Sequence, residues 1–325
     1  MKIRRLLFAI AVLPLSMKAQ YAPEAGMPGS TAMHADSSAF VAWATGCTIE
    51  RGLQQIDDES LGFAYYGAEA DGIGKADNMV VSLGDGGKAV LTFASNIVNG
   101  EGPDFAVFEN AFHNAPHAFL ELAFVEVSSD GEHFFRFPAV SAVPADSQMG
   151  SFELMDATLI HNFAGKYEAF YGTPFDLDDL TDDVLLDKNN VSHVRLIDVV
   201  GNIDPRYASY DSEGNAVNDP WPTPFYSSGF DLDAVGVIHD VAHHSAVVEH
   251  ESVVNIYPNP TSGLLYVRAE AGAYCEVLDM MGQRVLSLTF GAENPVLNLE
   301  SLASGVYLIR VINDGMMSVE RIMKR

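Results

Sequence analysis

Apolar and polar residues alternate along the chain in many short segments, and glycine-rich or proline-rich turns separate these segments. The clearest segment is 102–112, "GPDFAVFENAF", in which a turn leads into a strand with apolar residues on both faces. This strand ends in the polar pair Glu109 and Asn110, whose burial would require partners. Further strands are predicted at 40–44, 79–83, 89–93, 120–128, 133–137, 191–200 and 229–238.

Two pairs of these strands are predicted to form hairpins, which turn at 84–87 ("GDGG") and at 129–131 ("SDG"). The best helix candidate is 174–187, in which Asp176 can cap the first turn and further acids favour the positive N-terminal end. Residues 201–228 form a long loop with four prolines, and a loop of this length in a compact domain is usually functional. Many short strands and little helix favour an antiparallel β-sandwich.

The spacing of the strands changes after residues 239–252, which lack a clear period. Short strands then recur over about 70 residues, which is typical of a small immunoglobulin-like sandwich. The predicted fold class is therefore all-β: a jelly-roll β-sandwich at 20–243, a linker at 244–252, and a small immunoglobulin-like β-sandwich at 253–325.

Residues 1–19 have the features of a secretory signal peptide. Three bases among the first five residues give a positive start, and the apolar run 6–15 that follows is too short to span a bilayer. We expect cleavage before Gln20, and we expect no transmembrane segment in the mature chain.

The chain is strongly acidic, with 44 acids, 18 bases and a formal net charge of −26 over 325 residues. Such a charge repels phosphate backbones, so nucleic acid is excluded as a partner, whereas divalent cations are favoured. The two cysteines, Cys47 and Cys275, lie in different predicted domains, so we expect no disulfide framework.

Several oxygen-bearing side chains fall at the ends of the apolar strands, where a calcium ion would find carboxylates, amides and backbone carbonyls together. The sequence therefore predicts calcium as a stabilising ion, provided that the sheets bring 104–110 next to 229–233. The alternative is that Asp231 and Asp104 cap turns, and that Asp198 pairs with Arg195 or with backbone amides. The predicted metal ligands are Asp104, Glu109, Asn110, Asp198, Asp231 and Asp233.

Aromatic residues gather in the proline-rich loop, where Trp221, Phe225 and Tyr226 follow Tyr210. Exposed aromatic faces stack on sugar rings or flat ligands, and proline stiffens such a platform. These four residues are the predicted ligand-binding set. The alternative is that they fill the end of the sandwich as core.

Catalytic patterns are weak. Glu109 with Glu121 or Glu126 would offer a glycosidase carboxylate pair, but the alternation around Glu126 favours a solvated strand face. There is no Gly-x-Ser-x-Gly elbow. The pair His113 and His117, like the histidines at 239, 243 and 244, has metal-like spacing but lacks a patterned helix, which disfavours zinc. We therefore predict a non-catalytic protein.

The last 70 or so residues resemble the C-terminal sorting domain of the type IX secretion system of Bacteroidetes. The matching stretches are 256–263 ("IYPNPTSG"), 277–283 ("VLDMMGQ") and 302–310 ("LASGVYLIR"), with a basic end at 324–325. The resemblance implies export across the outer membrane by the type IX secretion machinery, removal of this domain, and release from the cell or attachment to its surface.

The stretch 125–131 ("VEVSSDG") of the larger domain resembles the hairpin of galactose-binding-like jelly rolls, the fold of discoidin domains and of carbohydrate-binding modules. The domain as a whole resembles an uncharacterised group of bacterial cell-surface proteins, and this resemblance implies no particular activity. The other matching stretches are 81–84, 104–110, 194–201 and 229–236. We expect a secreted or cell-surface protein that binds a glycan or another small ligand. The alternatives are a structural or adhesive surface protein without a small ligand, a glycan-active hydrolase, and an accessory surface protein of vitamin (cobalamin-like) uptake.

Overall fold

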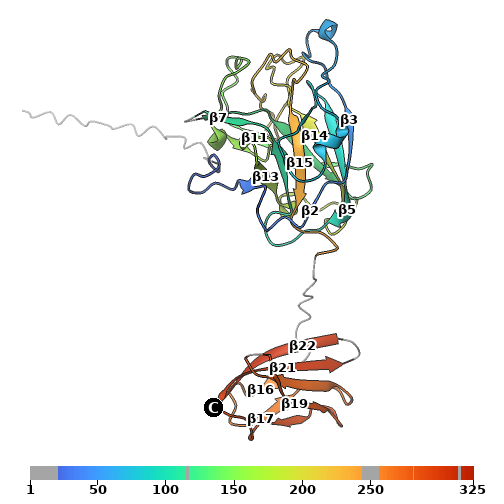
Figure 1. The fold of residues 1–325 in the computed structure, drawn as a ribbon, viewed down its shortest axis with the longest axis vertical. Helices are drawn as coiled ribbons and strands as arrows, with labels where there is room; N and C mark the ends of the chain where they lie inside the picture. The colour runs from blue at the N-terminus through green and yellow to red at the C-terminus, as the bar shows by residue number, and fades with distance from the viewer. Residues whose placement is uncertain (1–20, 115–116, 244–255, 281, 314–315) are drawn as a thin grey trace, which may run out of the picture. The chain divides into compact units, whose positions relative to one another are not determined.

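The computed structural model describes residues 21–114, 117–243, 256–280, 282–313 and 316–325. The chain divides into two compact units, Met1–His244 and Ser245–Arg325, and each is described by itself (Figure 1). The described residues form strands and short 3-10 turns, which confirms the all-β prediction. The predicted signal peptide at 1–19 and linker at 244–252 lie outside the described residues.

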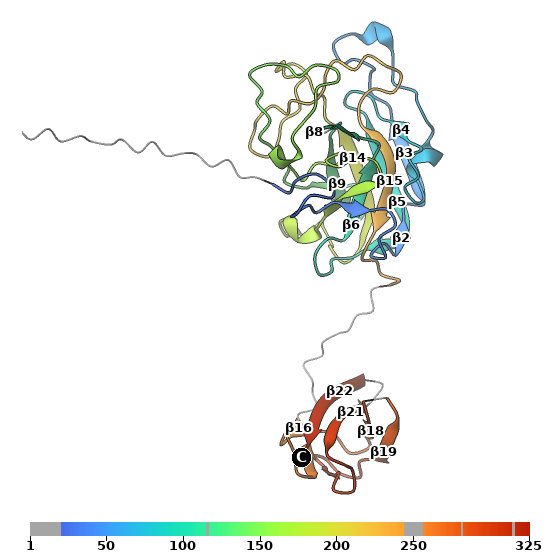
Figure 2. The ribbon, with the colours of Figure 1, turned by 60° about the vertical axis from the view of Figure 1, so that its left-hand side comes forward.

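The first unit contains two large antiparallel sheets, which can be followed in Figures 1 and 2. The first sheet has the order β1-β13-β6-β15-β2, and β4 pairs with the start of β15 on the edge opposite β6, because Leu232 faces Val81 of β4 on one side and Glu109 of β6 on the other. Its strands are β1 (Met33–His34), β2 (Ala42–Trp43), β4 (Val81–Ser82), β6 (Phe105–Glu109), β13 (Tyr171–Phe175) and β15 (Asp231–Val237).

The second sheet has the order β10-β9-β14-β5-β3. Its strands are β3 (Gly46–Glu50), β5 (Lys88–Ile97), β9 (Ala123–Ser128), β10 (Phe135–Arg136) and β14 (Val191–Asp198). Alternate residues of the two sheets point toward each other and form the main core, in which Val107 and Val235 of the first sheet belong to one cluster with Leu91, Val125 and Val194 of the second.

The central strands β6 and β15 are buried along their whole length, as the apolar pattern of both segments predicts. Their other face packs into a separate cluster, in which Phe108 contacts the rings of Phe40 and Trp43. A strand covered on both faces places any polar residue at its end in a site with little water.

A third apolar cluster covers the outer face of the second sheet, where Phe124 packs with Phe163, Leu122 and Ile160. Short elements contribute to this cluster: β8 (His117–Phe119), β12 (Ile160–His161) and the 3-10 turn η3 (Ala157–Leu159). Two further short strands, β7 (Phe112–Asn114) and β11 (Val140–Ser141), pair with β8 and β12 respectively. The remaining 3-10 turns are η1 (Glu59–Leu61), η2 (Glu69–Gly72) and η4 (Leu177–Asp179).

The two predicted hairpins have different outcomes. The one that turns at 129–131 is confirmed, because β9 pairs with β10. The one that turns at 84–87 is wrong, because β4 pairs with β15 in the first sheet whereas β5 lies between β14 and β3 in the second. The glycine turn therefore carries the chain from one sheet to the other, and the sequence does not show which partner a strand will choose.

The predicted helix at 174–187 is also wrong. Asp176 does cap a turn, since its side chain accepts a hydrogen bond from the Asp178 amide, but that turn is only η4. The preceding residues through Phe175 extend β13, which pairs with β6. Strand pairing and the burial of Leu177 and Leu186 in the main core outweigh the local helix signal, which is weak for so short a segment.

The second unit is a small β-sandwich in its own right. One sheet has the order β16-β17-β20 and the other β19-β18-β21-β22, and Leu265, Val277 and Ile309 meet in one core between them. The strands are β16 (Ile256–Tyr257), β17 (Leu264–Val267), β18 (Tyr274–Leu278), β19 (Arg284–Thr289), β20 (Val296–Asn298), β21 (Gly305–Asn313) and β22 (Met316–Lys324).

Helical segments are too short and too polar in the described part of the chain for any of them to cross a membrane.

Candidate functional site

Three of the predicted metal ligands meet where the ends of β6 and β15 adjoin. The register pairs Glu109 with Leu232, so that Asp231, Glu109 and Asn110 come together at one end of the first sheet. The Asn110 side-chain amide donates to Asp231 at 3.1 Å, and the Ser82 hydroxyl donates to the other oxygen of the same carboxylate. The condition set for the site, that the sheets bring segments 104–110 and 229–233 together, is therefore met.

Further buried carboxylates lie near Glu109 and Asp231. One is Glu121, which was considered above only as a member of a catalytic pair. Another is Asp219, which was not among the predicted site residues. The Asp219 carboxylate accepts a hydrogen bond from the Leu122 amide at 2.8 Å. No periodic pattern marks Asp219, because it lies in the proline-rich loop. The carboxylate cluster, as we name this group, consists of Asp85, Glu109, Glu121, Asp198, Asp219 and Asp231.

Burial and mutual repulsion keep these carboxylates from ionising easily. Loss of water raises the pKa of Glu109 and of Glu121 well above the ordinary value, and the charge of Asp231 raises both further. Burial also raises the pKa of Asp231 to about 6, which the charge of Arg51 partly opposes. The Glu109 Oε1 atom is buried and has no hydrogen-bond partner among the described residues, which is costly for an ionised carboxylate.

Two other predicted metal ligands, Asp104 and Asp233, accept hydrogen bonds from backbone amides of neighbouring turns. Asp104 accepts hydrogen bonds from the amides of Gly100 and Leu177 and lies 2.8 Å from the His239 ring nitrogen. Asp233 accepts from the backbone amides of residues 77 and 78. The turn-capping alternative thus describes Asp104, and Asp233 acts in the same way although it was not named there. Asp231 instead accepts hydrogen bonds from the side chains of Ser82 and Asn110.

Asp198 accepts from the amides of Gly86 and Phe230, at 2.8 and 2.7 Å, and still lies beside the carboxylate cluster. Of the two partners expected for Asp198, the structure thus shows the backbone amides. Arg195 instead pairs with Glu126, whose carboxylate also accepts a hydrogen bond from Arg136 Nε at 2.8 Å. The prediction of a solvated Glu126 is therefore wrong, because the side chain is buried between two arginines.

A row of exposed aromatic rings lies on the surface of the first unit. The Tyr226 ring stacks on that of Tyr65 with centroids 5.4 Å apart and contacts Tyr66 at 5.9 Å. The preceding residue, Phe225, stacks on Phe152 at 5.9 Å. This second group of rings continues through Phe119 to Phe112, and among the described residues it adjoins the tyrosine group only through the chain neighbours Phe225 and Tyr226. We call the whole set the aromatic strip: Tyr65, Tyr66, Phe112, Phe119, Phe152, Phe225 and Tyr226.

Most of the aromatic strip is open to solvent: Tyr65 is 68% exposed, Phe152 66% and Tyr226 50%, whereas Phe119 is buried. Two of the four predicted ligand residues, Phe225 and Tyr226, belong to it. Sequence reasoning missed the others because they come from segments far apart in the chain, including the short strands β7 and β8, with no common period.

The remaining two predicted ligand residues stand apart from the strip. Trp221 is half-buried, and its indole N–H donates to Asp85 at 3.2 Å. Tyr210 is 45% exposed and bridges to Ala216, and within the described residues no ring contact joins it to the strip.

The aromatic strip and the carboxylate cluster share one end of the sandwich. The Arg51 guanidinium donates to the backbone carbonyls of Tyr66 and Gly67, and its charge lies close to Asp231. On the other side, the backbone amide of Ala111, next to Phe112, donates to Glu109 at 2.6 Å. Buried acids therefore support the loops that hold the exposed rings.

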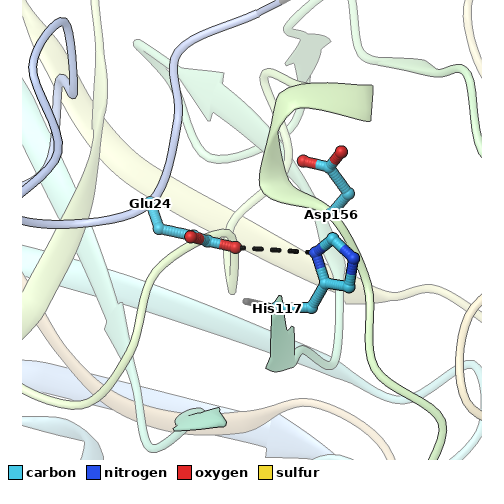
Figure 3. Close-up of side chains that lie close together, drawn as sticks. All are labelled: Glu24, His117 and Asp156. Atoms are coloured by element: carbon cyan, nitrogen blue, oxygen red, sulfur yellow. Dashed lines mark ion pairs between the residues drawn. The ribbon is translucent and has the colours of Figure 1, made fainter. Parts of the chain in front are cut away.

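A second group of potential metal ligands lies elsewhere in the first unit, and it was not predicted. Figure 3 shows the side chains of Glu24 and Asp156 converging on the ring of His117. One ligand atom of each residue lies within 4.8 Å of those of the other two. His117 Nδ1 is 3.9 Å from Glu24 Oε1, and it is buried without a hydrogen-bond partner in the described structure.

Comparison with protein families identifies the second unit. Residues 255–325 match the secretion system C-terminal sorting domain, which confirms the prediction made from the three sequence stretches. A protein with this tail is secreted or displayed on the surface of a Bacteroidetes-type bacterium, and the tail implies contact with the type IX secretion machinery.

Solved structures resemble the chain only weakly. PorZ, a surface component of the type IX secretion system of Porphyromonas gingivalis, is 17% identical over 29% of this chain and 14% of that chain, with a TM-score of 0.21. The BSP domain of a biofilm-associated protein is 10% identical over 89% of this chain and 52% of that chain, with a TM-score of 0.20.

A β-glucuronidase from Ruminococcus gnavus is 11% identical over 94% of this chain and 46% of that chain, with a TM-score of 0.21. The chain thus spans about half of the length of these structures or less. Scores this low support no argument about function, and the resemblance to galactose-binding jelly rolls stays a prediction. No curated protein matches the chain.

Proposed function

We propose that the first unit is an extracellular binding domain that holds a neutral glycan chain on the aromatic strip. The observation that supports this most strongly is a pair of mostly exposed aromatic groups, one of tyrosines and one of phenylalanines, which adjoin at the chain neighbours Phe225 and Tyr226. Within each group the contacting ring centroids lie 5.0 to 6.1 Å apart. Exposed aromatic rings are costly in water, and a contiguous set of them marks a binding surface. The sorting domain delivers the protein to the outside of the cell, where glycans are abundant.

The geometry and charge of the surface favour a glycan over other ligands. An elongated strip suits a chain-like ligand, which can stack on several rings in turn. Tyrosines supply hydroxyl groups for hydrogen bonds beside the apolar ring faces that sugar C–H groups prefer. The formal net charge of −26 repels polyanions, so we propose a neutral rather than a sulfated or phosphorylated chain.

We further propose that the carboxylate cluster takes a calcium ion when the domain is exported. Calcium binds several oxygens at once, and Glu109 offers an oxygen without a partner next to Asp231. An ion there would offset the repulsion between the buried acids. It would also hold the Arg51 and Asn110 loops beneath the aromatic strip.

A hydrolase is less favoured by the geometry. The carboxylates proposed as a catalytic pair, Glu109 and Glu121, are only 1% and 9% exposed, so a sugar ring would not reach them. An adhesive protein without a glycan ligand remains the alternative, in which the strip would contact another protein.

A screen of immobilised neutral polysaccharides tests the glycan proposal. We expect Tyr226→Ala to weaken retention about tenfold, or about 1.4 kcal/mol, because Tyr226 contacts two other rings of the strip. Tyr210→Ala is the matched control, since Tyr210 has similar exposure but lies off the strip. Equal loss in both variants, or no retention of the wild-type protein, would contradict the proposal.

A further inference from the structure

The backbone brings His117 and Asp156 opposite each other. Ala118 and Met155 form an antiparallel bridge in which each amide donates to the other carbonyl, at 3.1 and 2.8 Å. In an antiparallel pair, the residue before the first position faces the residue after the second, with both side chains on one face. His117 and Asp156 are therefore placed together by strand pairing.

Glu24 is brought to the same place by the N-terminal segment of the described structure. The Tyr21 ring stacks on His161 with centroids 4.7 Å apart and an angle of 6° between the rings. The Tyr21 amide also donates to the Thr158 carbonyl at 2.9 Å. These contacts fix the segment against η3, so that Glu24 reaches the ring of His117 (Figure 3).

The Asp156 carboxylate is already oriented before any ligand arrives. Its Oδ1 accepts hydrogen bonds from the amide and the hydroxyl of Thr158, at 2.9 and 2.7 Å. The second carboxylate oxygen of Asp156, Oδ2, is then available to a ligand. At 3.9 Å the Glu24 oxygen is too far from His117 Nδ1 for a hydrogen bond, so the buried nitrogen remains unsatisfied.

We propose that Glu24, His117 and Asp156 bind one divalent transition-metal ion of the zinc class. Ligand atoms around a tetrahedral zinc lie about 3.4 Å apart, given metal–ligand bonds of about 2.1 Å. The three atoms observed here lie within 4.8 Å of one another, so small side-chain movements would complete the site. An imidazole nitrogen with two carboxylates suits zinc better than calcium, which prefers oxygen.

The ion would have an open coordination position. His117 and Asp156 also line a cleft of about 330 Å³, together with Glu153 and Gln148. Three protein ligands with a fourth position open to solvent is the arrangement in which zinc retains a water molecule or binds a small ligand. The ion would also link three segments of the chain to one another: the N-terminal segment, β8 and η3.

Equilibrium dialysis of the full chain against Zn²⁺, with metal content measured by mass spectrometry, tests this proposal. We expect the wild-type protein to hold one zinc more than His117→Ala, and Asp156→Asn to bind zinc at least about tenfold more weakly. Asp156→Asn is informative because the amide oxygen can keep both hydrogen bonds to Thr158. Circular dichroism would check that the variants fold.

Two further variants separate this site from other metal-binding groups. His133→Ala removes a histidine that is paired with Asp130 at 2.8 Å elsewhere on the surface, and Glu109→Gln alters the carboxylate cluster. Both should retain the zinc. The proposal is overturned if folded His117→Ala binds as much zinc as the wild-type protein, or if His133→Ala loses as much as His117→Ala.

Discussion

Glu109 illustrates how a single buried carboxylate links stability to ligand binding. One oxygen accepts the Ala111 amide at 2.6 Å, whereas Oε1 is buried without a partner in the described structure. Burial and the neighbouring charge of Asp231 raise its pKa well above the ordinary value. The residue therefore destabilises the metal-free domain at alkaline pH, and it would be the natural ligand of a cation.

Glu109→Gln should separate these two effects. In the presence of a calcium chelator at pH 8, we expect the variant to be more stable than the wild-type protein by about 1 kcal/mol, because the amide avoids the cost of burying an acid that is ionised in the unfolded chain. We expect calcium to raise the melting temperature of the wild-type protein, and the same variant should lose this rise. Calorimetry with and without calcium measures both, and an unchanged calcium response would contradict the role of Glu109.

Residues near the ends of strands were the most predictable part of the site. The sequence could indicate that three residues belong to one polar group, because each lies at or beside the end of a buried strand, where polar groups need partners: Glu109, Asn110 and Asp231. Asp219 and Glu24 could not, because they lie in irregular segments. Their positions depend on contacts with distant residues, Leu122 and His117, that leave no periodic signal in the sequence.

At the scale of elements, β6 and β15 organise the first unit, and their identity follows from continuous apolar runs. The sequence does not indicate which strand each of the predicted strands pairs with. The turn at 84–87 has every feature of a hairpin, yet β4 joins β15 and β5 joins the opposite sheet. The segment 174–187 carries a helix cap, yet pairing of β13 with β6 and core packing of its leucines decide its structure.

The carboxylates at the ends of these elements predict how stability depends on pH. Burial raises the pKa of Asp85, Asp231 and Asp233 to about 6, above their ordinary value of 3.8. The folded state therefore binds more protons than the unfolded state between about pH 4 and pH 6, so stability is lost as pH rises through this window.

Without metal, we expect the free energy of unfolding to fall by at least about 2 kcal/mol between pH 4.5 and pH 7, as measured by urea denaturation. Calcium should flatten this dependence, because the ion replaces the protons in the carboxylate cluster. A metal-free protein that becomes more stable as pH rises through this window would contradict the burial of these acids.

At the scale of the whole molecule, the two units have separate cores and separate tasks. The main core of the first unit and the core of the second contain no common residues. The second unit carries the sorting domain, whereas the aromatic strip and both groups of proposed metal ligands belong to the first. Export and binding should therefore be separable.

Removal of residues 256–325 tests this separation. We expect the truncated protein to be absent from the culture medium and the cell surface, because the secretion machinery no longer recognises it. Its first unit should melt within about 2 °C of the same transition in the full chain, because its core is complete. Normal export, or loss of the folded first unit, would be inconsistent with this division of roles.

The most direct test of the central claim is a titration of the protein with a neutral oligosaccharide selected from the polysaccharide screen, observed through the NMR signals of ¹³C-labelled tyrosine rings. We predict that the signals of Tyr65, Tyr66 and Tyr226 shift together with one affinity, because the sugar chain covers their neighbouring rings. The signal of Tyr210 should stay in place. Shifts at Tyr210 alone, or bound sugar with no change at the three stacked tyrosines, would contradict binding on the aromatic strip.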